Sequence, residues 1–143
     1  MSYASDRCRV VKDWNARNIS QMPLTILHAE DHAVVANAVR VTLEAEGWRV
    51  VTCPDGAAAL SELASPNHYD LLITDDDLPR LCGIDLIDCA GMLRHRARLR
   101  VLMLTASDCE LEARRVGVAA FLKKPEGVGE LVPTIRRLLG RGA

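Results

Sequence analysis

Short apolar runs and helical stripes alternate along most of the chain. The apolar runs are bounded by polar residues or glycine, which is typical of strands buried inside a sheet. Between them, apolar residues recur every three or four positions, the period of an amphipathic helix. The predicted strands are 24–29, 48–53, 71–74, 101–104 and 118–122, and the predicted helices are 33–46, 54–64, 84–94, 108–116 and 128–139.

This alternation of strand and helix predicts an α/β fold. Successive βαβ units have right-handed crossovers and build a parallel sheet with helices on both faces. For five units we expect a flavodoxin-like (βα)5 doubly wound sheet with strand order 2-1-3-4-5. In the last helix Pro133 lacks a backbone N–H, so we expect either a late helix start or a kink there.

Charged and hydroxyl side chains follow four of the five predicted strands. They are Glu30 with Asp31, the run Asp75 to Asp77, Thr105, and Lys124. Because the carboxyl ends of parallel strands meet at one edge of a sheet, we expect these side chains to share a pocket. Adjacent carboxylates repel one another unless a cation offsets them, and oxygen ligands suit Mg²⁺. An ionised carboxylate beside a cation, a hydroxyl and an ammonium is suited to accepting a phosphoryl group.

Four segments, taken in this order, resemble the receiver domains of two-component response regulators, the CheY-like family. They read ILHAED, DLLITDDDLPRLCG, VLMLTAS and FLKKP, and the resemblance extends from about Leu24 to Leu139. It implies that Asp75 is the phosphoacceptor. It also implies a signalling protein rather than an enzyme, with at most self-catalysed phosphorylation and dephosphorylation.

The resemblance further implies how a metal is held and how the domain switches. Mg²⁺, with Mn²⁺ as an alternative, would be held by the carboxylates of Glu30, Asp31 and Asp75 and by the backbone carbonyl of Asp77. The switch residues would be the Thr105 hydroxyl, which turns toward the phosphoryl group, and the aromatic ring of Phe121. Lys124 would pair with the phosphoryl group, and its bond to Pro125 would be cis.

Two departures from the family pattern affect these expectations. Asp76 stands where the family usually has an apolar residue, and we expect its side chain to face away from the pocket, near solvent. The segment from Thr105 to Phe121 is about three residues shorter than in the family, nearly one helical turn. We therefore expect helix 4 of the fold to be shortened and the usual dimer to be weakened, leaving a monomer or a weak dimer.

Charge and cysteine usage narrow the choice of partners. Residues 23–93 carry 3 Lys and Arg against 12 Asp and Glu, whereas residues 94–143 carry 11 against 5. The basic residues are dispersed and no aromatics interleave with them, so we expect no direct contact with nucleic acid. Five cysteines without a CxxC pair predict reduced thiols in a cytoplasmic protein with no membrane segment.

The chain divides into a flexible N-terminal extension, 1–22, and a receiver domain, 23–143. Met22 is an alternative start, because MPLTILHAED opens directly into the first strand. The chain ends soon after Pro125, so we expect a stand-alone receiver in a phosphorelay. A sensor histidine kinase or a histidine phosphotransfer protein would donate the phosphoryl group, and output would pass to an unknown downstream protein.

Two other functions remain open from the sequence. One is a degenerate receiver that binds a protein without being phosphorylated, which the shortened helix and Asp76 favour. The other is a haloacid-dehalogenase-like phosphatase, which shares the order Asp75-x-Asp77, Thr, Lys. In that superfamily, however, the nucleophile normally sits on the first strand and an acidic motif follows the lysine.

The histidines and the arginine cluster have ordinary structural interpretations. His28 lies inside the first predicted strand, and we expect a hydrogen-bonded core histidine. His32 follows the acidic pair, and either occupies the helix start or approaches the metal. The cluster formed by Arg94 to Arg96 and Arg98 to Arg100 is expected to be a solvated helix end, with a docking patch as the alternative.

Overall fold

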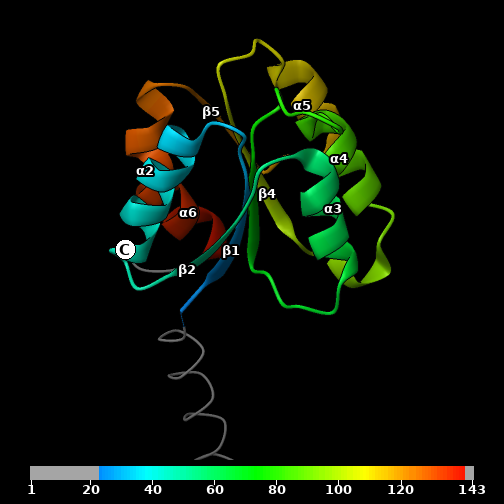
Figure 1. The fold of residues 1–143 in the computed structure, drawn as a ribbon, viewed down its shortest axis with the longest axis horizontal. Helices are drawn as coiled ribbons and strands as arrows, with labels where there is room; N and C mark the ends of the chain where they lie inside the picture. Colours follow the sequence, from blue (N-terminus) through cyan, green and yellow to red (C-terminus); the bar gives the residue numbers. More distant parts are fainter. Residues whose placement is uncertain (1–22, 141–143) are drawn as a thin grey trace, which may run out of the picture.

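A computed structural model describes residues 23–140 of the chain (Figure 1). The predicted extension 1–22, the alternative start at Met22 and residues 141–143 lie outside the described part. The strands are β1 (Thr25–Ala29), β2 (Arg49–Cys53), β3 (Leu71–Thr74), β4 (Arg100–Thr105) and β5 (Ala120–Lys123). The helices are α2 (Ala33–Glu44), α3 (Gly56–Ala64), α4 (Gly83–Ala90), α5 (Glu110–Val116) and α6 (Leu131–Leu139), with 3-10 helices η1 (Arg94–Arg96) and η2 (Glu126–Glu130).

The five strands form one parallel sheet in the order β2-β1-β3-β4-β5, which confirms the predicted topology. Strand β3 lies between β1 and β4, and none of its four residues is exposed. The apolar run that predicted a fully buried strand is therefore at the centre of the sheet. The polar residues that follow it emerge at the middle of the carboxyl edge.

Each face of the sheet is covered by its own group of helices (Figure 1). Helices α2 and α6 pack on one face, over strand residues such as Ile26 and Ile73. Helices α3, α4 and α5 pack on the other, over residues such as Leu27 and Leu72. Because successive strand residues point to opposite faces, the two cores are built from alternate positions. This double cover buries the sheet but leaves the loops at its carboxyl edge free to form a site.

Helix boundaries differ from the predicted ones mainly where glycine and proline occur. Helix α5 spans only seven residues, which confirms the expected shortening. It ends at Val116, and the next residue, Gly117, has a φ of 103° that suits glycine. Helix α6 begins late, at Leu131 after η2, and this places Pro133 in its first turn, where proline is tolerated. Within residues 23–140, none of the helices combines the length and the apolar character needed to cross a membrane.

Arg96, predicted to lie in a solvated helix end, is instead buried. Its guanidinium donates to the carbonyls of Leu63 (2.8 Å), Ser65 (3.0 Å) and Asn67 (2.5 Å), at and beyond the end of α3. It also lies 5.3 Å from the centre of the Tyr69 ring. The last carbonyls of a helix have no partners within the helix, so Arg96 caps α3 from a distant segment. The prediction was wrong because η1 folds back onto α3.

Replacing Arg96 with methionine is expected to lower the free energy of unfolding by about 2 kcal/mol, because one buried and two partly buried carbonyls would lose a charged donor. The matched control is Arg94→Met, at the first residue of the same 3-10 helix and exposed to solvent, which is expected to change stability by less than about 0.5 kcal/mol. Urea unfolding of the two variants and the wild type measures the difference. Equal stabilities of the two variants would contradict the capping role.

Candidate functional site

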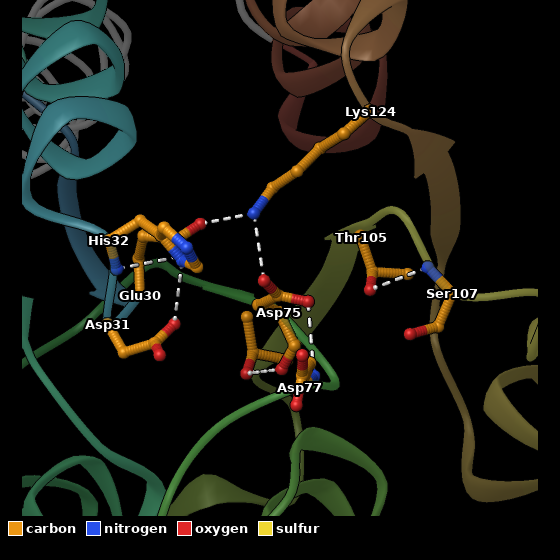
Figure 2. A network of polar contacts seen from close by, with 9 residues as sticks. Glu30, Asp31, His32, Asp75, Asp77, Thr105, Ser107 and Lys124 are labelled. Carbon is orange, nitrogen blue, oxygen red and sulfur yellow. Dashed lines mark hydrogen bonds and ion pairs between the residues drawn. The ribbon is translucent and has the colours of Figure 1, made fainter.

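Loops at the carboxyl ends of β1, β3, β4 and β5 bring the predicted site residues into one pocket (Figure 2). Glu30 and Asp31 follow β1, Asp75 follows β3, Thr105 ends β4 and Lys124 follows β5. Glu30, Asp75 and Thr105 are buried, whereas Asp31 is exposed to solvent. The strand order is what joins them, since β1 and β4 both pair with β3.

Lys124 lies between two buried carboxylates. Its Nζ donates to Asp75 Oδ2 at 2.8 Å and to Glu30 Oε1 at 2.5 Å. The exposed fractions of the three side chains are 14% for Lys124, 7% for Asp75 and 0% for Glu30. The peptide bond from Lys124 to Pro125 is cis, as predicted.

These contacts fix the charge states of Asp75 and Lys124. Burial alone would raise the pKa of Asp75, but Lys124 and the nearby Thr105 hydroxyl outweigh burial and lower this pKa. Burial alone would lower the pKa of Lys124, but its hydrogen bonds to Asp75 and Glu30 raise this pKa. At neutral pH Asp75 is therefore a carboxylate and Lys124 an ammonium.

The backbone around Asp75 is held from several sides. Its second carboxylate oxygen, Oδ1, accepts from the Asp77 amide at 3.2 Å, and its own amide donates to the Ala29 carbonyl at 3.1 Å. Gly83, the first residue of α4, packs directly on this turn. A Cβ at Gly83 would lie 2.1 Å from the carbonyl oxygen of Asp75, so only glycine permits this approach.

Thr105 and Phe121, the predicted switch residues, lie on neighbouring strands. Thr105 is fully buried, and its Oγ1 accepts from the Ser107 amide at 3.2 Å (Figure 2). Phe121 pairs with Met103 in the β4–β5 register and is half-buried against the core on the α5 side. Ser107 was not singled out from the sequence, because its contribution is a backbone amide that any residue supplies.

The pocket carries more negative charge than Lys124 can balance. The ammonium of Lys124 contacts the carboxylates of Glu30 and Asp75, and Asp31 and Asp77 add two more carboxylates in the same loops (Figure 2). Carboxylate and carbonyl oxygens are the ligands that Mg²⁺ prefers. The donor set predicted for a metal therefore fits a hard divalent cation, both in charge and in the type of ligand atom.

Asp76 was predicted to face solvent, but the structure shows otherwise. Its side chain is half-buried, and Oδ1 accepts from the Ile84 amide at 3.1 Å in the first turn of α4. The carbonyl of Asp76 accepts from Gly83 at 3.0 Å as well. A carboxylate is favourable at a helix N-terminus, where free amides and the helix dipole are both positive. Asp76 thus links the loop after β3 to α4, and the N-terminus of α4 stabilises its negative charge.

His28 is buried as predicted, but it is not hydrogen-bonded. The residue is 1% exposed, and neither ring nitrogen has a partner among the described residues. Burial, reinforced by the nearby charge of Lys124, lowers the pKa of His28 to about 4. Because it alternates with Leu27 and shares a face with Ile26, His28 lies on the α2 and α6 side, beneath the pocket.

His32 directly follows the acidic pair, at the N-cap of α2. Its amide donates to Glu30 Oε2 at 3.2 Å, and its ring Nδ1 lies 3.3 Å from Asp31 Oδ1 (Figure 2). The structure confirms that His32 occupies the helix start, and it also places the ring beside the carboxylates. The signal was its position immediately after two predicted metal ligands.

Comparison with known proteins identifies the family. The model of the response regulator receiver domain matches residues 26–136. The chain belongs to the response-regulator receiver family. The matched range contains all four of the segments that resemble this family. Membership argues against the haloacid-dehalogenase alternative, in which the nucleophile normally sits on the first strand, whereas Asp75 follows β3.

Two curated relatives of this receiver are named as transcriptional regulatory proteins. The probable transcriptional regulatory protein TcrX of Mycobacterium tuberculosis is 33% identical over 129 residues, which cover 87% of this chain and 53% of TcrX. CutR of Streptomyces coelicolor is 36% identical over 118 residues, which cover 80% of this chain and 53% of CutR. The chain thus spans about half the length of these relatives.

Solved structures show the same fold. The chemotaxis response regulator CheY4 of Vibrio cholerae has a TM-score of 0.76 and 28% identity, with 82% of this chain and 100% of that chain covered. The receiver domain of the sensor histidine kinase PA1611 from Pseudomonas aeruginosa also has a TM-score of 0.76, with 25% identity and coverage of 83% and 99%. That structure has a magnesium ion coordinated in its active site cleft.

Proposed function

We propose that this receiver accepts a phosphoryl group on Asp75 in a two-component phosphorelay. The donor would be the phosphohistidine of a sensor histidine kinase or of a histidine phosphotransfer protein. The observation that carries the proposal is the contact of Lys124 Nζ with Asp75 Oδ2, at 2.8 Å, at the carboxyl edge of the sheet. It keeps Asp75 ionised, and an ionised carboxylate is a nucleophile.

The side chains support transfer by positioning and charge. One carboxylate oxygen of Asp75 forms a bond to phosphorus while the bond from phosphorus to the donor imidazole breaks, and the imidazole nitrogen keeps the electron pair. Lys124 already bonds to Asp75, so its ammonium can pair with an incoming phosphoryl oxygen. The Thr105 hydroxyl can donate to another. Such charge neutralisation is the main requirement of phosphoryl transfer.

Mg²⁺ fits the remaining acidic groups of the pocket. Glu30, Asp31 and Asp75 would hold it through carboxylate oxygens, and Asp77 through its backbone carbonyl. When bound, the cation would neutralise charge on these carboxylates and on the phosphoryl oxygens. Mn²⁺ also accepts oxygen ligands and is an alternative.

Output would follow from rearrangement of β4 and β5. Thr105 would turn toward the phosphoryl group and release space beside Phe121, whose half-buried ring could then move inward. These residues border the surface formed by α5, β5 and α6, where Leu111 is 73% exposed. We propose that this surface binds a downstream protein. Because α5 is short, we expect the receiver itself to be a monomer or a weak dimer.

Mass spectrometry tests the proposed function. The wild type, Asp75→Asn and the matched control Asp77→Asn are incubated with acetyl phosphate and Mg²⁺. The wild type and Asp77→Asn are expected to gain one phosphoryl group, since Asp77 offers its carbonyl, and Asp75→Asn to gain none. Peptide mapping should place the group on Asp75, and EDTA should prevent its attachment.

Other outcomes of this experiment point to the other functions. A wild type that stays unmodified with acetyl phosphate and with a phosphohistidine donor would contradict the proposal and favour the degenerate, phosphorylation-independent receiver. Repeated turnover of phosphate esters would favour the phosphatase instead. Modification of Asp75→Asn at another residue would refute the assignment of the phosphoacceptor.

A further inference from the structure

His32 places an imidazole nitrogen beside the acidic pair. Its Nδ1 lies 3.3 Å from Asp31 Oδ1 and 3.8 Å from Glu30 Oε2 (Figure 2). One ligand atom from each of the three residues lies within 4.8 Å of those of the other two. The three residues are consecutive and come from the single turn that joins β1 to α2.

These separations suit three ligands of one cation. Two ligand atoms that are each about 2.1 Å from a cation lie about 3 Å apart at a right angle and about 4.2 Å apart when opposite. The two distances from Nδ1 fall inside this range. Rotation of the His32 and Asp31 side chains, which are 71% and 33% exposed, would therefore turn their ligand atoms and the buried Glu30 Oε2 toward a common centre.

The surroundings of His32 leave its ring free to bind. The side chain is 71% exposed, so the ring is not part of the core. The backbone is fixed nevertheless, because the His32 amide donates to Glu30 Oε2 at 3.2 Å and α2 begins at the next residue. Asp31 is 33% exposed, so it faces solvent together with His32, whereas Glu30 lies buried behind them. A cation can reach them without opening the fold.

An imidazole changes which cations a site prefers. Carboxylate and carbonyl oxygens suit Mg²⁺, Ca²⁺ and Mn²⁺, whereas imidazole nitrogen suits Zn²⁺, Ni²⁺ and other late first-row ions. We propose that His32 is an additional ligand that gives this site a preference for Co²⁺, Ni²⁺ and Zn²⁺ over Mg²⁺. This inference rests on the proposed metal site and adds to it a nitrogen donor and a class of cation.

Calorimetric titration of the metal-free protein with Co²⁺ and with Mg²⁺ tests this preference. His32→Gln removes the nitrogen ligand but keeps a neutral polar side chain. The matched control is His68→Gln, since His68 Nε2 also lies near a carboxylate, 2.9 Å from Asp70 Oδ1, but outside the pocket. His32→Gln is expected to weaken Co²⁺ binding about tenfold and to leave Mg²⁺ binding nearly unchanged. His68→Gln should match the wild type for both ions.

The visible spectrum of bound Co²⁺ gives a second measurement, because it should change in His32→Gln and not in His68→Gln. Equal weakening of Co²⁺ and Mg²⁺, or no weakening of either, would overturn the assignment of His32 as a ligand. If His32 is not a ligand but the wild type still binds Mg²⁺, the proposed metal site stands without it. If neither ion binds to the wild type, the proposed metal site fails together with this inference.

Discussion

Lys124→Met is expected to lower the free energy of unfolding by about 3 kcal/mol in metal-free buffer. Lys124 is the ammonium shared by Glu30 and Asp75, whose side chains are 0% and 7% exposed. Without it, two buried carboxylates would face each other uncompensated, and removal of one partner from a buried ion pair costs about 3–5 kcal/mol. Methionine keeps the length of the aliphatic chain, so the loss reports on charge.

The matched control is Lys123→Met. Lys123 pairs with Asp108, whose side chain is 97% exposed, and surface pairs of this kind contribute about 0–1 kcal/mol. Urea denaturation of both variants measures the two effects. Equal stability of the two variants would show that the buried carboxylates do not depend on Lys124.

The same substitution should also slow phosphorylation. Loss of a donor aimed at developing charge reduces a rate by about 100-fold or more, so Lys124→Met is expected to acquire the phosphoryl group far more slowly than Lys123→Met. Adding Mg²⁺ should recover part of the lost stability but not the rate, because a cation offsets charge without replacing the donor of Lys124. Full recovery of the rate by Mg²⁺ would contradict a direct role for the lysine.

His28→Leu is expected to stabilise the protein at neutral pH by about 1–2 kcal/mol. The two ring nitrogens of His28 are buried without a partner among the described residues, and leaving a buried polar group unpaired costs about 1–3 kcal/mol. Leucine matches the aliphatic residues around this position, such as Ile26 and Ile73. Thermal or urea unfolding of variant and wild type measures the gain.

The gain should grow in acid. The pKa of His28 is about 4 in the folded protein, against 6.5 for an ordinary histidine. Between these pH values the unfolded chain binds a proton that the folded chain does not, so the stability of the wild type falls as the pH falls. The difference between the two pKa values corresponds to about 3 kcal/mol of stability. The wild type has this stability in full above about pH 6.5 and has lost it by about pH 4.

Unfolding measured in EDTA from pH 7 to pH 4.5 separates this effect from metal binding. The wild type and the exposed control His68→Gln are expected to lose stability in parallel, and His28→Leu to lose less. A His28→Leu variant with the same pH dependence as the wild type would show that another group is responsible. A less stable variant at pH 7 would mean that the imidazole packs better than leucine.

The order of the strands and the location of the site could be predicted from local patterns. Apolar runs and helical stripes depend on neighbouring residues, and right-handed crossovers restrict how five βα units can be arranged. The polar residues after each strand, such as Asp75 and Lys124, then had to meet at the carboxyl edge. Because the direction and the ends of each strand are local properties, this much follows from the order of residues.

The partners of individual side chains could not be predicted in this way. Lys124 forms a hydrogen bond with Glu30, which is 94 residues away in the sequence, and Arg96 with Leu63, which is 33 residues away. Asp76 was predicted to face solvent and Arg96 to lie in a solvated helix end, but packing brought each to the free backbone groups of a helix terminus. His28 was predicted to be hydrogen-bonded, but the packed residues around it provide no partner.

The physical reason for this division is the range of the interactions. Backbone conformation and the alternation of buried and exposed positions are set over a few residues, so they can be read along the chain. Hydrogen bonds and ion pairs require atoms within about 3–4 Å, and which atoms come that close depends on how distant elements pack. The residue types around Asp75 could therefore be foreseen, whereas the pairing of Lys124 and the position of the His32 ring came from the folded chain.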